Sequence, residues 1–540
     1  MPLWYNVVSK YHILTTKANM ELNYQIKNGN EYAKVPGTSY RENGKIKKRG
    51  VIYLGRVIDK ERHIFCNRER GIFSFDPETG EFGKADETYV SDLKTDGRKK
   101  EKILLDFGDS FFLDSLIRNM GYSAVLDSMP YRNKDTLYAM VQYYLLSCSA
   151  NNHAKVWYEG NYASIMYPKA NLTSQRITDF LTSLGQPESV SSFFDAHIAW
   201  VKSKCDDPAV LMDSTGLPNN IHFPLTAVSN HNGKISREVR MTTLVQRDTG
   251  YPLLFRINPG NIVDLSTVTR TLNELFMRDM AADFAILDAG YYTNDNIEEL
   301  YGCEVDFITR LSSKYAVYNE IIKEHLATLK ERDNLVQYKD RYVYIKRVEC
   351  KIGHKGHTAY AYLGYDVDRG SDESHKALKR AARNHTSTAD LHKSLENSGL
   401  FMIVSSLPFE TDGILPAYYM RQLIEQYFDI SKGSSKLTPL RVHSEEALYG
   451  HLILSMIAAT VNVYIQNVTN RIYDDREEIF MTLRNQKCTV YKSKITNTEP
   501  QKNANEFYKA FGIKCPLYIE QANGRLISRY HLPKPKRAEL

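Results

Sequence analysis

The sequence predicts an α/β core that carries a β-rich insertion and is preceded by a small basic β-containing domain and a helical domain. Three observations predict this fold class. Apolar and polar residues alternate over the first 90 or so positions, as they do in short strands. Helical spacing of apolar residues then runs to about residue 204. Beyond it, short apolar strands alternate with amphipathic helices, which favours an α/β sheet.

Residues 1–92 form the predicted basic β-containing domain. The stretches GVIYLGRVID and HIFCNRERGIFSFD alternate between turn-rich pieces. Residues 1–70 hold 14 Lys and Arg against 6 Asp and Glu, a balance of +8 that exceeds the +6 of the whole chain. Such a surface suits a polyanion such as DNA, although a solvated charge run is the commoner meaning. LKTDGRKKEK, residues 93–102, is predicted to be a linker.

The helical domain is predicted over residues 103–204, with segments such as TLYAMVQYYLLSC and SQRITDFLTSLG. Two short strands in the α/β part are each expected to end on a carboxylate: AVLMD on Asp213 and FAILD on Asp288. Residues 312–398 interrupt the strand and helix rhythm with β-like stretches and the basic helix KALKRAARNH, so they are interpreted as an insertion. The apolar strand GLFMIVSS then resumes the sheet.

Composition excludes several classes of protein. With 42% apolar and 25% charged residues and no biased tract, the chain is typical of a globular protein. Its seven cysteines show no CxxC spacing, so we expect small core residues in a reducing compartment and no disulfides. The longest uncharged apolar run, residues 452–465, is too short to cross a bilayer, and no membrane role is expected.

The segment YYMRQLIEQYFDISK, residues 418–432, is predicted to be one amphipathic helix with Gly433 as its C-cap. On a helical wheel Tyr418, Arg421, Glu425 and Lys432 share one narrow stripe. By itself such a stripe is most simply a solvated face with a weak Arg421–Glu425 pair. Beside the two strand-ending aspartates it has a second interpretation, because strand ends and an adjacent helix can converge on one point.

Three converging carboxylates would bind a divalent metal. Mg²⁺ prefers oxygen ligands and keeps several waters, so two or three carboxylates suffice when a substrate phosphate supplies the rest. Two such ions can support an in-line displacement at phosphorus. Arg421 and Lys432 would then hold flanking phosphates, and Tyr418 could donate a hydrogen bond to a phosphate or stack on a base.

The spacing Tyr-x2-Arg-x3-Glu-x6-Lys resembles the signature of DDE transposases of the insertion-sequence-four type. Further stretches agree in order: LMDSTG with Asp213, TGYPLLFRINPGN followed by Asp264, ILDAGYYTNDN with Asp288, FITRL, and RVHSEEALYGHLILSMIA. The basic start, KVPGTSYRENGKIKKRGVIYLGRVID, is similar to the amino-terminal region of one branch of that family.

The resemblance implies a ribonuclease H-like catalytic core, a mixed sheet with flanking helices, over residues 205–470 with the β-rich insertion at 312–398. It implies that Asp213, Asp288 and Glu425 bind the metal, Mg²⁺ or Mn²⁺, as two ions. Tyr418, Arg421 and Lys432 would contact transposon-end DNA.

The reaction implied by the resemblance is cut-and-paste transposition of an insertion sequence, with hydrolysis at the element ends and strand transfer to target DNA. The expected partner is double-stranded DNA, bound by a homodimer. The expected location is the bacterial cytoplasm, with the protein at the nucleoid when it is bound to DNA. Residues 471–540 would serve dimerisation or DNA contact.

Alternatives stay open at this point. Each aspartate taken alone could begin a turn. The chain could be a domesticated, catalytically silent DNA-binding protein, a ribonuclease H-like nuclease without strand transfer, or, least of all, a paired-carboxylate glycosidase. His451 lies on an apolar helix and is interpreted as a satisfied core or interface histidine. Arg237 and Arg240, near His231, and the helix KALKRAARNH are weaker candidates for DNA contact.

Overall fold

The computed structural model describes residues 20–85 and 103–526, apart from gaps at 28–29, 43–44, 68, 206, 220–224, 232–233, 261–267, 385–386, 434, 441, 470–475, 492–493 and 523–524. The chain forms two compact units, Met1–Ile103 and Leu104–Leu540. The predicted linker at 93–102 and the position of Asp264 lie outside the described residues.

The N-terminal unit contains a six-stranded antiparallel sheet in the order β1-β2-β5-β6-β7-β8. One face buries a small core that includes Leu54, Phe65 and Phe75. Among the described residues, β3 and β4 pair only with each other. The strands are β1 (Asn23–Lys27), β2 (Asn30–Val35), β3 (Thr38–Glu42), β4 (Lys45–Arg49), β5 (Ile52–Asp59), β6 (Ile64–Asn67), β7 (Gly71–Phe75) and β8 (Phe82–Lys84).

The second unit opens with one strand and a group of helices, because apolar residues here recur at helical spacing. Large aromatic side chains fill the core between these helices, among them Phe111, Tyr143 and Tyr144, which are fully buried. The elements are β9 (Ile103–Asp106), α2 (Gly108–Asn119), α3 (Ser123–Ser128), α4 (Lys134–Leu146), η1 (Asn151–His153), α5 (Ala154–Gly160), α6 (Ala163–Met166), α7 (Ser174–Leu184) and α8 (Pro187–Lys202).

A mixed sheet flanked by helices forms the centre of this unit. Its strand order is β11-β12-β10-β14-β15-β19-β18-β17-β16, with β13 paired to β12. Only β10, β14 and β15 run parallel to one another. The strands are β10 (Ala209–Pro218), β11 (Ala227–His231), β12 (Lys234–Gln246), β13 (Pro252–Pro259), β14 (Phe284–Leu287), β15 (Asp306–Arg310), β16 (Leu335–Tyr338), β17 (Arg341–Ile352), β18 (His357–Asp366) and β19 (Leu400–Ser405).

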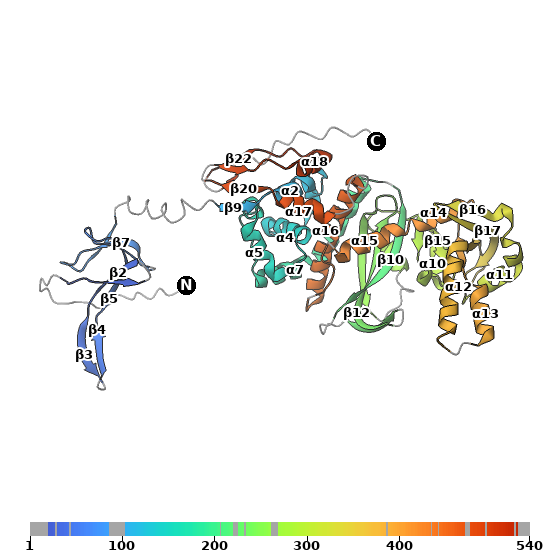
Figure 1. Ribbon diagram of the computed structural model, residues 1–540, viewed down its shortest axis with the longest axis horizontal. Helices are drawn as coiled ribbons and strands as arrows, with labels where there is room; N and C mark the ends of the chain where they lie inside the picture. Colours follow the sequence, from blue (N-terminus) through green and yellow to red (C-terminus); the bar gives the residue numbers. More distant parts are fainter. Residues whose placement is uncertain are drawn as a thin grey trace. The chain divides into compact units, whose positions relative to one another are not determined.

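The segment predicted as an insertion, residues 312–398, extends this sheet. Its strands β16, β17 and β18 add to the edge at β19, and its helices α12 and α13 lie beside them (Figure 1). The helices and short turns of the central part are α9 (Val268–Phe276), η3 (Ala289–Tyr291), α10 (Asn294–Gly302), α11 (Ala316–Leu329), η4 (Arg332–Asn334), α12 (Val367–Ala381), α13 (Thr388–Glu396), α14 (Ile414–Tyr419) and α15 (Gln422–Gly433).

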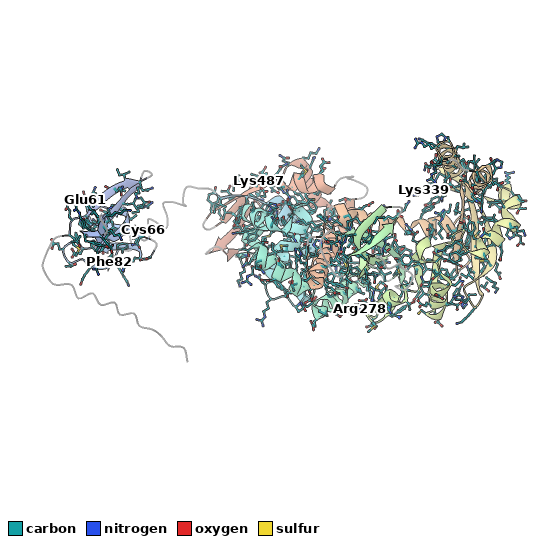
Figure 2. All side chains as sticks on the ribbon, turned by 90° about the horizontal axis from the view of Figure 1, so that it is seen from below. Glu61, Cys66, Phe82, Arg278, Lys339 and Lys487 are labelled. Carbon is teal, nitrogen blue, oxygen red and sulfur yellow. The ribbon has the colours of Figure 1, made fainter. Side chains whose placement is uncertain are left out.

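The C-terminal part returns to the helical group. β20–β23 form a sheet with β9, the strand that opens the unit. Lys487, labelled in Figure 2, places its Nζ 2.5 Å from Asp106 Oδ1, and Arg484 Nε lies 2.8 Å from the buried Asp109. The elements are α16 (Glu445–Thr469), α17 (Arg476–Arg484), β20 (Lys487–Val490), β21 (Lys494–Asn497), α18 (Lys502–Ala510), β22 (Tyr518–Ala522) and β23 (Arg525–Leu526).

Helix α16 is the central helix of the unit and packs against α4, α7 and α15. It is the one helix among the described residues that is long and apolar enough to cross a membrane, but 89% of its most apolar window is buried inside the fold. Its composition is therefore that of a core helix. All seven cysteines are free.

Candidate active site

Asp213 and Asp288 lie side by side on neighbouring strands. β10 and β14 are parallel and in register from Ala209↔Phe284 to Met212↔Leu287. The residue that follows this paired segment is Asp213 in one chain segment and Asp288 in the other. Because parallel strands advance together, this register alone brings the two carboxylates to the same edge of the pairing.

Asp213 does not end its strand, contrary to the prediction. β10 continues to Pro218 because residues after Asp213 go on pairing with β12, starting with Asp213↔Thr243. Asp288 does follow the last residue of β14 directly and begins the short turn η3. The two acids thus lie where the parallel pairing of β10 with β14 stops, while the antiparallel pairing of β10 with β12 goes on.

The segment that carries Glu425 is two helices rather than one. α14 ends at Tyr419 and α15 begins at Gln422, so Met420 and Arg421 form a turn between them. Gly433 is the last residue of α15 and lies within the helix, so the predicted C-cap is wrong. The break puts Arg421 at a corner facing the sheet.

The guanidinium of Arg421 joins the three carboxylates. Its Nη2 atom lies 2.6 Å from Glu425 Oε1 and 3.7 Å from Asp213 Oδ2. The other terminal nitrogen, Nη1, donates to Asp288 Oδ1. Arg421 is only 17% exposed. Side chains 212 residues apart in the sequence therefore contact one cationic group.

This arrangement sets the electrostatics of the site. Burial alone would lower the pKa of Arg421, but the neighbouring Asp288 and Asp213 outweigh it and raise that pKa above its ordinary value. Among the residues that the structure describes, no group of three or more His, Cys, Asp and Glu is arranged to share a metal ion. The reason is local, since Arg421 lies between the carboxylates.

The other two residues of the predicted stripe surround this cluster. Lys432 Nζ donates to Thr215 Oγ1, and Thr215 is two residues beyond Asp213, on the same face of β10. Burial lowers the pKa of Lys432. Tyr418 is 8% exposed, and burial raises the pKa of its hydroxyl to about 12. Tyr418, Arg421, Glu425 and Lys432 thus stay on one side despite the helix break.

Two arginines that the sequence analysis did not assign belong to the same place. A cavity of about 200 Å³ is lined by Asp288, Tyr418, Arg421 and Glu425 together with Arg310 and Arg369. Arg310 ends β15, in the stretch FITRL, and Arg369 is in the first turn of α12. Arg310 could have been found from the sequence, because FITRL is one of the stretches that resemble the transposase family. Arg369 comes from the inserted segment, where no sequence pattern pointed to it.

A buried hydrogen-bond network holds Ser214, the residue that follows Asp213. Arg240 Nη1 donates to Ser214 Oγ over 3.1 Å, and its Nη2 is 3.2 Å from Glu238 Oε1. Glu238 packs so closely on Gly216 that a Cβ there would lie 2.4 Å from the carboxylate. Arg240, weighed as a DNA contact, instead serves this network.

The sequence of the core matches a known family. Residues 204–461 fit the family model described as Transposase DDE domain. This match supports a DDE transposase. The matched residues include both aspartates, Glu425 and all of the predicted stripe. No curated protein matches the chain.

A solved structure also aligns with the chain. It is a piggyBac transposase synaptic complex with hairpin DNA, solved by cryo-electron microscopy. The alignment covers 69% of this chain and 78% of that one, at 11% identity and a TM-score of 0.36. This likeness is distant.

Proposed function

We propose that this protein is a cut-and-paste transposase of the insertion-sequence-four type that hydrolyses DNA at the element ends and joins them to target DNA. The observation that carries the proposal is the contact of one guanidinium with Asp213, Asp288 and Glu425 inside a segment that matches the transposase DDE domain. The strand order β13-β12-β10-β14-β15, three antiparallel strands followed by two parallel ones, supports a ribonuclease H-like core.

The donor chemistry of the three carboxylates suits a divalent cation, which would take the place that the Arg421 guanidinium holds among them in this structure. All three touch a single positive group, so their oxygens are close enough to share a charge, and oxygen is the donor that Mg²⁺ and Mn²⁺ prefer. Asp213, Asp288 and Glu425 would hold the ions, two by analogy with other phosphoryl-transfer sites. Such ions would stabilise charge that develops on the reacting phosphate.

The basic residues of the site would hold the DNA. Arg421 carries a planar fork of donors that suits a phosphate as well as a carboxylate, so it could turn from the acids to the DNA. The same cavity is lined by Arg310 and Tyr418. Beside it, Lys432 donates a hydrogen bond to Thr215 on β10. They would fix the strand so that the bond to be broken lies over the carboxylates. Two element ends must meet, so we propose a homodimer on DNA.

Cleavage of a duplex built from the DNA that flanks the gene tests the proposal. We expect cuts at the element boundary with Mg²⁺ or Mn²⁺, and joining of the freed ends to target DNA. Glu425→Gln should abolish cutting while DNA binding persists. Asp429→Asn is the matched control, because it removes an exposed carboxylate one turn further along α15.

Three results would contradict the proposal. Equal cleavage by Glu425→Gln and the wild type would show that this carboxylate is not part of the machinery. Cutting without joining would favour a nuclease of the same fold. Binding without cutting by the wild type would favour a silent DNA-binding protein.

A further inference from the structure

The ribbon of β3 and β4 projects from the six-stranded sheet of the N-terminal unit (Figure 1). Every residue of both strands is exposed. Neither strand pairs with any other strand among the described residues. A two-stranded hairpin by itself is marginally stable in water, and this one has no apolar face to bury. Its side chains are therefore available to a partner.

Basic residues occupy both faces of this ribbon. Residues directly opposite in an antiparallel pair share a face, so Tyr40↔Lys47 and Glu42↔Lys45 define one face and Arg41↔Ile46 the other. The first face also carries Arg49, and the second carries Lys48. The ribbon thus has five bases and one acid, and that acid is paired with Lys47 at 2.7 Å.

Two exposed apolar side chains distinguish the ribbon from an ordinary solvated charge run. Ile46 is 68% exposed and Tyr40 is 43% exposed, one on each face. By contrast, Lys60 in the adjacent sheet is paired with Glu31 at 2.9 Å and covers the ring of Tyr24. Lys60 is thus used within the fold, whereas among the described residues Lys47 is the one base of the ribbon that has an ion pair.

We infer that β3 and β4 enter the major groove of duplex DNA as a two-stranded ribbon. This inference rests on the proposed function, which requires the chain to bind DNA. The major groove is wide enough for such a ribbon, and its walls are the two phosphate backbones. A ribbon that lies in the groove therefore has phosphates on both sides of it, within reach of long basic side chains from either face. Ile46, on the face that carries Arg41 and Lys48, would contact base edges, including thymine methyl groups.

The test compares two double variants of the full-length chain. Arg41→Gln with Lys48→Gln removes two bases from one face of the ribbon. Lys27→Gln with Lys84→Gln removes two exposed bases from β1 and β8 of the neighbouring sheet. Affinity for an element-end duplex is measured by fluorescence anisotropy over a range of salt concentrations. Melting temperatures establish that each variant is folded.

Loss of two phosphate contacts should reduce the magnitude of the slope of log K against log salt concentration by about 1.8, at about 0.9 for each phosphate. Affinity at low salt should fall about tenfold or more, while the control double should keep the wild-type slope. Ile46→Ala should weaken binding without changing the slope.

Equal slopes in the two doubles would overturn the inference. If the ribbon double also cleaves element ends as the wild type does, the proposed function stands and the inference alone fails. If the wild type binds no duplex DNA at all, the proposed function fails with it. A tenfold loss confined to the ribbon double supports both.

Discussion

Arg421 is the residue on which the geometry of the site depends. Its single positive charge lies among three carboxylates and reduces their mutual repulsion. The sequence correctly predicted that Arg421 lies beside Glu425. Its predicted role was to contact DNA. The contact with Asp213 and Asp288 was not predictable from its spacing, because it depends on the turn at Met420–Arg421 and on the register of β10 with β14.

Arg421→Met should destabilise the protein in the presence of a chelator by about 1–2 kcal/mol, because the acids lose their shared cation. Added Mg²⁺ should raise the melting temperature of this variant more than that of the wild type, since bound ions stabilise the folded state. Melting curves with EDTA and with Mg²⁺ measure both effects.

Arg347→Met is the control for this prediction. Arg347 pairs with the exposed Glu410 at 3.4 Å, and neither residue lines the cavity beside the acids, so its loss should change little under either condition. An Mg²⁺ response of Arg421→Met no larger than that of the control would contradict the assigned role.

Some residues of the site could be predicted from the sequence and others could not. The acids were identified because each follows a short apolar strand or lies on an amphipathic helix, and both patterns are local. Arg369 escaped detection because it comes from an inserted segment and reaches the cavity only through tertiary packing. His451 was expected to be a satisfied core histidine, and both of its ring nitrogens have hydrogen-bond partners.

At the level of helices and strands, their alternation could be predicted from the sequence, but the residues at which they end could not. β10 runs past Asp213 because a neighbouring strand continues to pair with it, which no local pattern in LMDSTG shows. The helix predicted over residues 418–432 breaks at Met420 and Arg421, where Arg421 contacts the acids. In both cases a long-range contact overrides a local preference.

The packing of α7 against α16 depends on Gly450. A Cβ at this position would lie 2.0 Å from the carbonyl oxygen of Leu181, which is backbone and cannot swing away. Gly450→Ala should therefore destabilise the protein by about 1–3 kcal/mol, despite the better helix propensity of alanine. The measurement is the change in the midpoint of chemical unfolding.

Gly160→Ala serves as the comparison for Gly450. Gly160 is the last residue of α5, and a Cβ there would meet nothing within 4 Å. It should be neutral or slightly stabilising. Similar effects of the two substitutions would show that α7 and α16 do not pack as closely as the structure indicates.

At the scale of the whole molecule, the helical, central and C-terminal segments share one core. β9 precedes the helices but completes the sheet of β20–β23, and α16 packs on α4 and α15 alike. The sequence indicated where each segment changes character, and those boundaries remain predictions. It could not show that the inserted strands extend the main sheet, because strand order depends on pairings between distant residues.

Two buried histidines make stability depend on pH. Burial lowers the pKa of His197 and His451 to about 4, against an ordinary value near 6.5. Each is held neutral between a tyrosine hydroxyl and a backbone carbonyl. Since the unfolded chain takes up these protons first, their stabilising effect is complete above pH 6.5 and is lost as the pH falls toward 4.

We expect a loss of about 2 kcal/mol for each histidine between pH 7.5 and pH 5. The melting temperature measured across this range should fall as the pH falls. His451→Gln should have a weaker dependence than the wild type. A melting temperature that stays constant from pH 7.5 to pH 5 would contradict the buried, neutral state of both histidines.

Mn²⁺ binding followed by electron paramagnetic resonance tests whether Asp213, Asp288 and Glu425 together hold divalent cations. We expect saturable binding to the wild type and to Asp429→Asn, and binding at least tenfold weaker in Glu425→Gln and in Asp213→Asn. Equal Mn²⁺ affinity in all four proteins would contradict this expectation, because the ions would then be held somewhere other than these carboxylates.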